Sequence, residues 1–177
     1  DLHSTSRRQR HMCIRDRSCM LILLSFVTVN AQEKKELKEG DQAPSFKYLD
    51  INGKEVSLSD LKGKYVYIDV WATWCGPCQY ELPHLKELEK KMHGKKIVFV
   101  SISCDKDKAA WEKMVKEQGL GGVQLHNGGD REFMTAFGIR GIPRFILLDK
   151  EGKIVNPNMT RPSNPETEKT LKALKGI

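Results

Sequence analysis

The chain has 177 residues, of which 39% are hydrophobic and 30% are charged, and its formal net charge is +7. This length suits one globular domain with a hydrophobic core of its own. The first 31 residues hold five arginines and two aspartates, which leaves 25 basic and 21 acidic residues in the rest. A mildly basic, well-mixed surface of this kind is typical of solvated helix faces, so we exclude nucleic acid as a partner.

The N-terminal segment differs in composition from the rest of the chain. Residues 20–31 form a short apolar run that ends in small residues, and Val29 and Ala31 fit a signal-peptidase site before Gln32. The run is too short to span a bilayer as a mature helix. We expect residues 1–31 to be a non-native start plus a signal-peptide remnant, residues 32–39 a flexible lead-in, and residues 40–177 the folded domain. If the leader stayed uncleaved, it would tether the protein to a membrane.

The remaining residues predict an alternation of strands and helices. An Asn52-Gly53 turn joins the first two strands into a hairpin, and a short turn or helical turn follows at 59–63. Strands are predicted over residues 46–50, 54–58, 64–71, 96–103, 123–126, 144–148 and 153–155. Helices are predicted over residues 81–92, 107–118, 130–137 and 165–175.

This order of elements is typical of an α/β domain. Strands that alternate with helices predict a largely parallel sheet, to which the closing hairpin at 149–152 adds antiparallel strands. In open α/β sheets, functional groups gather at the carboxyl ends of the parallel strands. The end of the strand at 64–71 is therefore where we expect a site.

Two cysteines follow that strand in the motif Cys75-Gly76-Pro77-Cys78. The Gly-Pro pair favours a turn, so the two sulfur atoms can close a small disulfide ring. A motif between strand and helix places the first sulfur at a helix N-terminus, where free N–H groups and the helix dipole favour a thiolate. The thiolate is the species that attacks disulfides, so the motif predicts a redox-active pair.

Other uses of paired cysteines fit less well. A structural disulfide with this spacing closes almost no loop and stabilises little. A zinc site needs a second ligand pair at matching spacing, and Cys104, His84, His93 and His126 form none. Haem attachment needs a histidine directly after the second cysteine, where Gln79 stands. We therefore predict no metal.

A family resemblance supports the redox interpretation. The stretch Trp71-Ala-Thr-Trp-Cys-Gly-Pro-Cys78, the following Glu81-Leu-Pro83 and the later Gly141-Ile-Pro143 resemble thioredoxin-fold proteins, above all the exported TlpA/ResA-like thiol-disulfide oxidoreductases. The opening 40–44 and the stretch 56–63 also resemble peroxiredoxins. The resemblance implies a three-layer sandwich in which a central mixed sheet, with an N-terminal β-hairpin, has helices on both faces.

The same resemblance assigns roles to the motif. It implies that Cys75 is the exposed nucleophile and that Cys78, one helical turn further in and more buried, is the resolving thiol. Attack by Cys75 on a substrate disulfide gives a mixed disulfide, which Cys78 then releases.

Residues around the motif are implied to position the substrate. Pro143 matches the family's cis-proline, and a cis Ile142–Pro143 bond would face the motif and align a substrate strand. Trp74, Gly76 and Pro77 are expected to contact the substrate.

Two acidic residues complete the implied site. Asp69 stands where thioredoxins have a buried acid, and an apolar strand would raise its pKa so that it could accept the proton of Cys78. Glu81 stands where TlpA/ResA-like proteins have a glutamate near the disulfide, although a first-turn glutamate is also favoured by the helix dipole alone. Cys104 is interpreted as a small buried hydrophobe, with a third-thiol role as the lesser alternative.

The direction of electron flow is predicted from the residues between the cysteines. Gly-Pro is the thioredoxin pair, whose reduction potential is roughly −270 mV, so we expect a reductase of envelope disulfides such as those of apocytochromes or misoxidised proteins. It would work in the periplasm or cell envelope and receive electrons from a membrane thiol-relay protein. No NADPH or flavin motif is found, so no cofactor is predicted.

Three other functions remain as alternatives. A peroxidase of the peroxiredoxin type needs Pro and Thr where Ile68 and Ala72 stand, so its peroxide pocket is absent from the sequence. An envelope thiol oxidase or isomerase differs from a reductase by its potential alone. A non-catalytic envelope binding module would not need the two cysteines.

Overall fold

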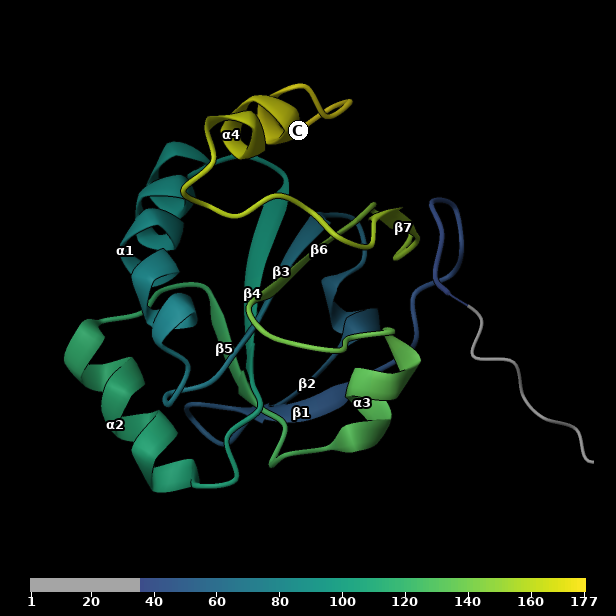
Figure 1. The fold of residues 1–177 in the computed structure, drawn as a ribbon. Helices are drawn as coiled ribbons and strands as arrows, with labels where there is room; N and C mark the ends of the chain where they lie inside the picture. Colours follow the sequence, from purple (N-terminus) through teal and green to yellow (C-terminus); the bar gives the residue numbers. More distant parts are fainter. Residues whose placement is uncertain (1–35) are drawn as a thin grey trace, which may run out of the picture. The chain divides into compact units, whose positions relative to one another are not determined.

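The computed structural model describes residues 36–177. Seven strands form one mixed sheet in the order β2-β1-β5-β4-β3-β6-β7 (Figure 1). The strands are β1 (Lys47–Asp50), β2 (Glu55–Ser57), β3 (Tyr65–Trp71), β4 (Ile97–Ser103), β5 (Val123–His126), β6 (Arg144–Leu148) and β7 (Ile154–Asn156). The helices are the 3-10 turn η1 (Leu58–Leu61) and the α-helices α1 (Gly76–Lys91), α2 (Lys108–Gln118), α3 (Arg131–Ala136) and α4 (Pro165–Lys172).

The sheet is less parallel than the alternation of elements predicts. Only the three central strands β3, β4 and β5 run parallel, while β6 pairs with β3 in the antiparallel direction. The hairpin β1–β2 adds two more antiparallel strands through β5. The expectation of a largely parallel sheet was therefore wrong, and the mixed sheet implied by the family resemblance was right.

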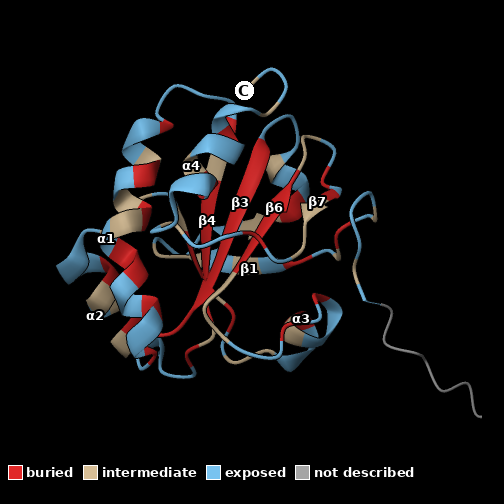
Figure 2. Cartoon of the chain, turned by 45° about the horizontal axis from the view of Figure 1, so that its top comes forward, coloured by how far each residue is buried: buried red, intermediate tan, exposed pale blue. Residues whose placement is uncertain are grey.

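Helices cover both faces of this sheet, as a three-layer sandwich requires. Alternate residues of β3 point to opposite faces. Ile68 and Val70 pack with Phe133 and Phe137 from the α3 side. On the other face, strand residues pack against side chains of α1, α2 and α4 (Figures 1 and 2). Strand β3 is buried along its whole length, so the core lies directly beneath both helical layers.

Two helix boundaries differ from the prediction by more than one residue. Apolar spacing placed the start of the first helix at Glu81, but α1 begins at Gly76. The extra turn lies at the rim of the domain, where Pro77 and Tyr80 are exposed and give no apolar periodicity. The last helix ends at Lys172 rather than at Lys175.

The predicted N-terminal organisation concerns residues that mostly lie outside the described part. Residues 1–35 are not described, so the predicted leader at 1–31 lies outside it. Of the lead-in at 32–39, only residues 36–39 are described, and Leu37 packs partly against the core. Among the helices of residues 36–177, none has both the length and the apolar character to cross a membrane.

Candidate active site

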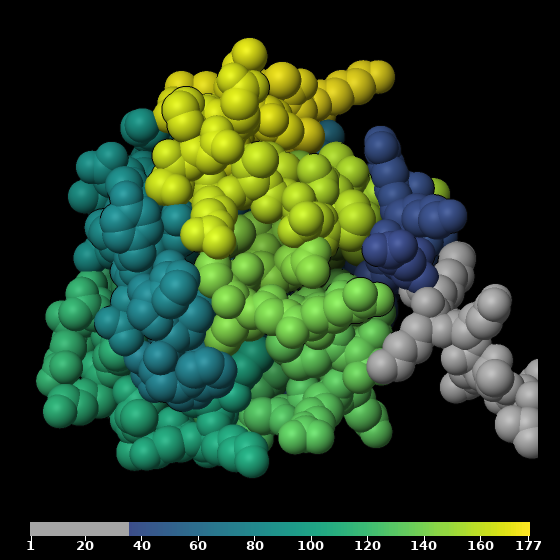
Figure 3. Space-filling view, in the orientation of Figure 1, coloured from purple at the N-terminus to yellow at the C-terminus, as the bar shows by residue number. Residues whose placement is uncertain are grey.

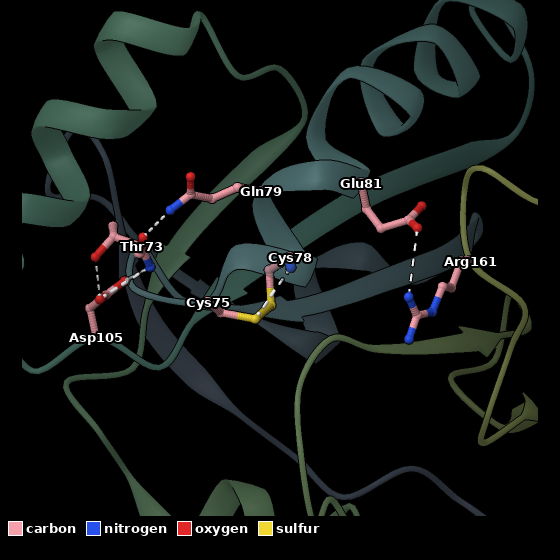
Figure 4. The surroundings of a disulfide bond; sticks show 7 residues. All are labelled: Thr73, Cys75, Cys78, Gln79, Glu81, Asp105 and Arg161. Carbon is pink, nitrogen blue, oxygen red and sulfur yellow. Dashed lines mark hydrogen bonds and ion pairs between the residues drawn. A yellow bond between two sulfur atoms is a disulfide. The ribbon is translucent and has the colours of Figure 1, made fainter.

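The two cysteines of the motif form a disulfide at the start of α1. Cys75 is the N-cap of the helix, and its Cα lies 5.2 Å from that of Cys78. The backbone N–H of Cys78 points to the sulfur of Cys75, with an N···Sγ distance of 3.3 Å (Figure 4). Pro77 lies in the first turn, where a missing N–H and a fixed φ suit a helix. The strand-to-helix placement predicted for the motif is therefore found.

Burial of the two sulfur-bearing residues differs from the prediction. Cys75 is only 6% exposed, against 2% for Cys78, so the expectation of an exposed Cys75 was wrong for the disulfide form. The reason is packing, because both cysteines belong to a cluster with Trp71, Ala72 and Leu82. The order of burial is as predicted, with Cys78 the deeper of the two.

The rim around the disulfide is exposed and partly aromatic. Trp74 is 70% exposed, and Gly76 and Pro77 are exposed beside it. Tyr80 is 65% exposed and packs against the ring of His84, with 5.4 Å between ring centroids. Sequence reasoning missed Tyr80, because an exposed aromatic residue in a helix leaves no periodic signal. Its position two residues after Cys78 was the only indication.

Opposite the helix start lies the segment that leads into β6. The Ile142–Pro143 peptide bond is cis, as the family resemblance implied. Arg144, the first residue of β6, pairs with Val70 near the end of β3. Ile142 packs against the cluster that contains both cysteines. The cis-proline segment and the disulfide therefore lie at the same edge of the sheet.

Asp69 lies on β3 with its side chain fully enclosed. The pKa of Asp69 is raised to about 8, mainly by burial and in smaller part by the nearby charges of Glu81 and Glu89. The hydroxyl of Ser101 opposes this effect, although its oxygen is 3.5 Å from the carboxylate. The predicted raised pKa is thus found, and its cause is the predicted one.

Glu81 is buried and lies beyond the first turn of α1, so it is not the first-turn glutamate that the helix dipole alone would favour. It is 3% exposed, and its carboxylate accepts hydrogen bonds from the backbone N–H and the hydroxyl of Ser163, at 3.0 and 2.9 Å. The guanidinium of Arg161 lies 4.0 Å away (Figure 4). Glu81 therefore joins α1 to the loop at 157–164, one helical turn beyond Cys78.

A third buried acidic side chain, that of Asp105, holds the loop in front of the disulfide. It follows β4 and accepts hydrogen bonds from the backbone N–H and the hydroxyl of Thr73, at 2.9 and 2.7 Å, and from the hydroxyl of Ser103 at 2.6 Å. The side-chain amide of Gln79 donates to the carbonyl of Thr73 from the other side (Figure 4). Sequence reasoning missed this contact. The only signal was an aspartate just after a strand that ends at the functional edge.

Cys104 lies next to Asp105 but faces another part of the core. Its sulfur lies 3.6 Å from that of Met134, and burial raises the pKa of its thiol to about 11. These surroundings agree with the interpretation of Cys104 as a small hydrophobe, although the residue is only partly buried.

The comparisons with known proteins all point to the same family. The model of the redoxin family matches residues 38–174. A thiol-disulfide oxidoreductase ResA from Bacillus thuringiensis is 32% identical over 143 residues, which cover 80% of this chain and 82% of the relative. The ResA of Bacillus subtilis is 31% identical, and the match covers 84% and 85% of the two chains.

Solved structures agree in fold and in activity. A Bacteroides vulgatus protein, solved in solution and described as a thiol-disulfide oxidoreductase, is 67% identical with a TM-score of 0.68. The match covers 73% of this chain and 85% of that one. A crystal structure from Chlorobium tepidum, described as a thiol:disulfide interchange protein DsbE, is 27% identical with a TM-score of 0.68. There 77% of this chain and 94% of the other are covered. The chain therefore belongs to the redoxin family, as a thioredoxin-fold thiol-disulfide oxidoreductase of the TlpA/ResA type.

Proposed function

We propose that this protein reduces disulfides of other proteins in the cell envelope, with Cys75 and Cys78 as the reacting pair. The observation that carries the proposal is the disulfide at the N-terminus of α1, at the carboxyl end of β3. It lies at the edge where an open α/β sheet places its chemistry. The exposed rim of Trp74, Gly76 and Pro77 gives a partner protein access to this edge.

The exchange starts from the dithiol form of the protein. The Cys75 thiolate attacks one sulfur of the substrate disulfide, so a mixed disulfide forms and the other substrate sulfur leaves as a thiolate. Cys78 then loses its proton and attacks the sulfur of Cys75, which breaks the mixed disulfide and frees the second substrate thiolate. Two electrons pass to the substrate, and the protein is left with the Cys75–Cys78 disulfide.

Helix geometry supports Cys75 as the attacking sulfur. Its Sγ receives the N–H of Cys78 and lies at the positive end of the α1 dipole. Both interactions favour the thiolate over the thiol in the reduced protein. Cys78, the deeper residue, is then the one that must be deprotonated during the second step.

Asp69 is suited to take up that proton. A carboxyl whose pKa is about 8 is ionised in roughly one molecule in ten at pH 7. In that ionised form it is a strong enough base to accept the proton of a thiol. Its side chain lies on the face of β3 that also bears Trp71, a neighbour of both cysteines in the core. Glu81 acts indirectly in this proposal, because its charge raises the pKa of Asp69.

The substrate chain is proposed to lie between the exposed rim and the cis-proline. Ile142 packs against the cysteine cluster, so the backbone before Pro143 is close to the disulfide. An extended substrate segment could add to this edge as a short strand. Trp74 would then cover it from the side of α1.

The family supports the cellular setting that we propose. Disulfide-containing proteins are the general substrate class, and the resemblance to exported TlpA/ResA-like proteins favours the periplasm or cell envelope. An oxidising compartment requires a source of electrons, for which we propose a membrane thiol-relay protein. Fractionation of cells that express the intact native gene tests this setting, and recovery of the protein only from the cytosol would contradict it.

The reduction potential of the full chain tests the direction of the exchange. The reduction potential of the Cys75–Cys78 pair is measured by equilibration against glutathione or dithiothreitol, and we expect roughly −270 mV. A value above roughly −180 mV would instead make the protein an oxidase or isomerase.

Trapping tests the roles of the two cysteines. A Cys78→Ser variant should accumulate a mixed disulfide with a model substrate, located on Cys75 by mass spectrometry, because the second step is blocked. Cys75→Ser should form none. A mixed disulfide on Cys104, or exchange that survives Cys75→Ser, would overturn the assignment.

A further inference from the structure

A groove of about 500 Å³ opens beside the cis-proline. Its lining includes Pro143 and a polar stretch of the loop at 157–164, with Asn158, Thr160, Arg161 and Ser163. Figure 3 shows this loop in yellow-green beside α1 in teal, and the hydrogen bonds of Ser163 to Glu81 join the two. A substrate segment that passes Pro143 would therefore place its neighbouring side chains in or near this groove.

Arg161 is the only charged side chain among the described residues that line the groove. Its side chain is 56% exposed, and Figure 4 shows it extending from its loop toward Glu81. The separation of 4.0 Å from Glu81 is too long for a hydrogen bond. Within residues 36–177, no hydrogen bond is found for the guanidinium group. Its N–H donors are therefore open to a ligand in the groove.

Glu81 does not need these donors. Its carboxylate already accepts two hydrogen bonds from Ser163, so the Arg161 guanidinium can turn toward the groove without leaving Glu81 unpaired. A guanidinium is planar and matches a carboxylate through two parallel hydrogen bonds. The chemistry of the groove thus favours an anion, with Asn158 and Thr160 as further polar neighbours.

We propose that this groove is a subsite for an acidic side chain of the substrate protein, in which Arg161 pairs with an aspartate or glutamate near the reacting cysteine. The inference rests on the proposed function, because it places the substrate chain along the cis-proline. It narrows the substrate class to disulfides with a carboxylate close to one of their cysteines.

Peptide disulfides test this preference. Each short peptide of a set has one cysteine in a mixed disulfide and one aspartate, which is placed at one of the three positions on either side of that cysteine. For each such peptide, a matched peptide has asparagine in place of the aspartate. The reduced full-length protein is mixed with each peptide, and the second-order rate constant of reduction is measured. At one position or more, we expect the aspartate peptide to react about fivefold faster, the upper end of what an exposed ion pair contributes.

Variants then assign the preference to Arg161. Arg161→Gln should remove the difference in rate between the aspartate and asparagine peptides. Arg140→Gln is the matched control, because Arg140 is exposed two residues before Ile142 but does not line the groove. It should keep the preference. Added salt should reduce the preference of the wild type, because it screens exposed charges.

The outcomes separate this proposal from the proposed function. If the wild type reduces all peptides but shows no preference for aspartate, or if Arg161→Gln keeps the preference, the subsite is wrong while the exchange chemistry stands. If the dithiol form reduces none of the peptides, the proposed function itself fails.

Discussion

The two sides of the disulfide are built from similar polar residues but differ in how those residues are used. On one side, the buried carboxylate of Asp105 accepts three short hydrogen bonds from Thr73 and Ser103. On the other side, a groove of about 500 Å³ contains the exposed guanidinium of Arg161. Polar groups that satisfy one another fix a loop, whereas polar groups that face a groove can bind a ligand. The first side thus sets the position of the disulfide, and the second influences what approaches it.

The largest effect on stability is expected from Asp105→Asn, which disrupts the hydrogen bonds that hold the loop on the first side of the disulfide. The amide NH₂ would face groups that now donate to the carboxylate, and a buried donor without an acceptor is costly. We expect the free energy of unfolding to fall by about 3 kcal/mol, measured by urea denaturation of the oxidised protein.

Asp107→Asn provides the matched control for this change. Asp107 is exposed in the same loop and caps α2, where asparagine is as good an N-cap as aspartate. Its effect should be close to zero. Equal and small losses for both variants would mean that Asp105 does not fix the loop, and the contrast between the two sides would disappear.

A second effect, of intermediate size, is expected at Asp69 beneath the disulfide. Within residues 36–177, the one hydrogen bond of the Asp69 side chain is a long one, from the hydroxyl of Ser101, and burial is the main reason that its pKa is raised from 3.8 to about 8. A raised pKa in the folded state means that the wild type loses stability as the pH rises through this range. Asp69→Asn stays neutral, so its free energy of unfolding relative to the wild type should rise by about 2 kcal/mol between pH 5.5 and pH 7.

Urea denaturation at a series of pH values measures this difference. A constant difference between Asp69→Asn and the wild type would mean that the carboxyl has an ordinary pKa in the folded protein.

Much of the site follows from local sequence. The Cys75–Cys78 motif, the cis-proline at Pro143 and the burial of Asp69 each depend on residues within a few positions of one another, or on a motif that the family shares. Apolar runs long enough to be buried on both faces also identify β3 and β4. These features are the ones that prediction from the sequence found.

The other features of the site depend on contacts between distant parts of the chain. Thr73 and Asp105 are 32 positions apart and meet because β3 and β4 pair in register, with Trp71 opposite Ser103. Glu81 and Ser163 are 82 positions apart and meet through a loop without periodic structure. The sequence of one segment does not indicate which distant polar group will form a hydrogen bond with a residue in that segment. Prediction from the sequence therefore missed both contacts and the groove.

The smallest effect is expected on the open side, from Ser163→Ala. The change removes the hydroxyl that donates to Glu81 at 2.9 Å but leaves the backbone N–H at 3.0 Å and the Arg161 guanidinium nearby. Because the carboxylate keeps the hydrogen bond from the backbone N–H, the loss in free energy of unfolding should be about 1 kcal/mol, measured by urea denaturation. The exposed Ser45→Ala is the control and should change little. A loss for Ser163→Ala as large as that for Asp105→Asn would show that the groove side is held as firmly as the other, and Arg161 would then be needed to hold the loop rather than free to bind a substrate.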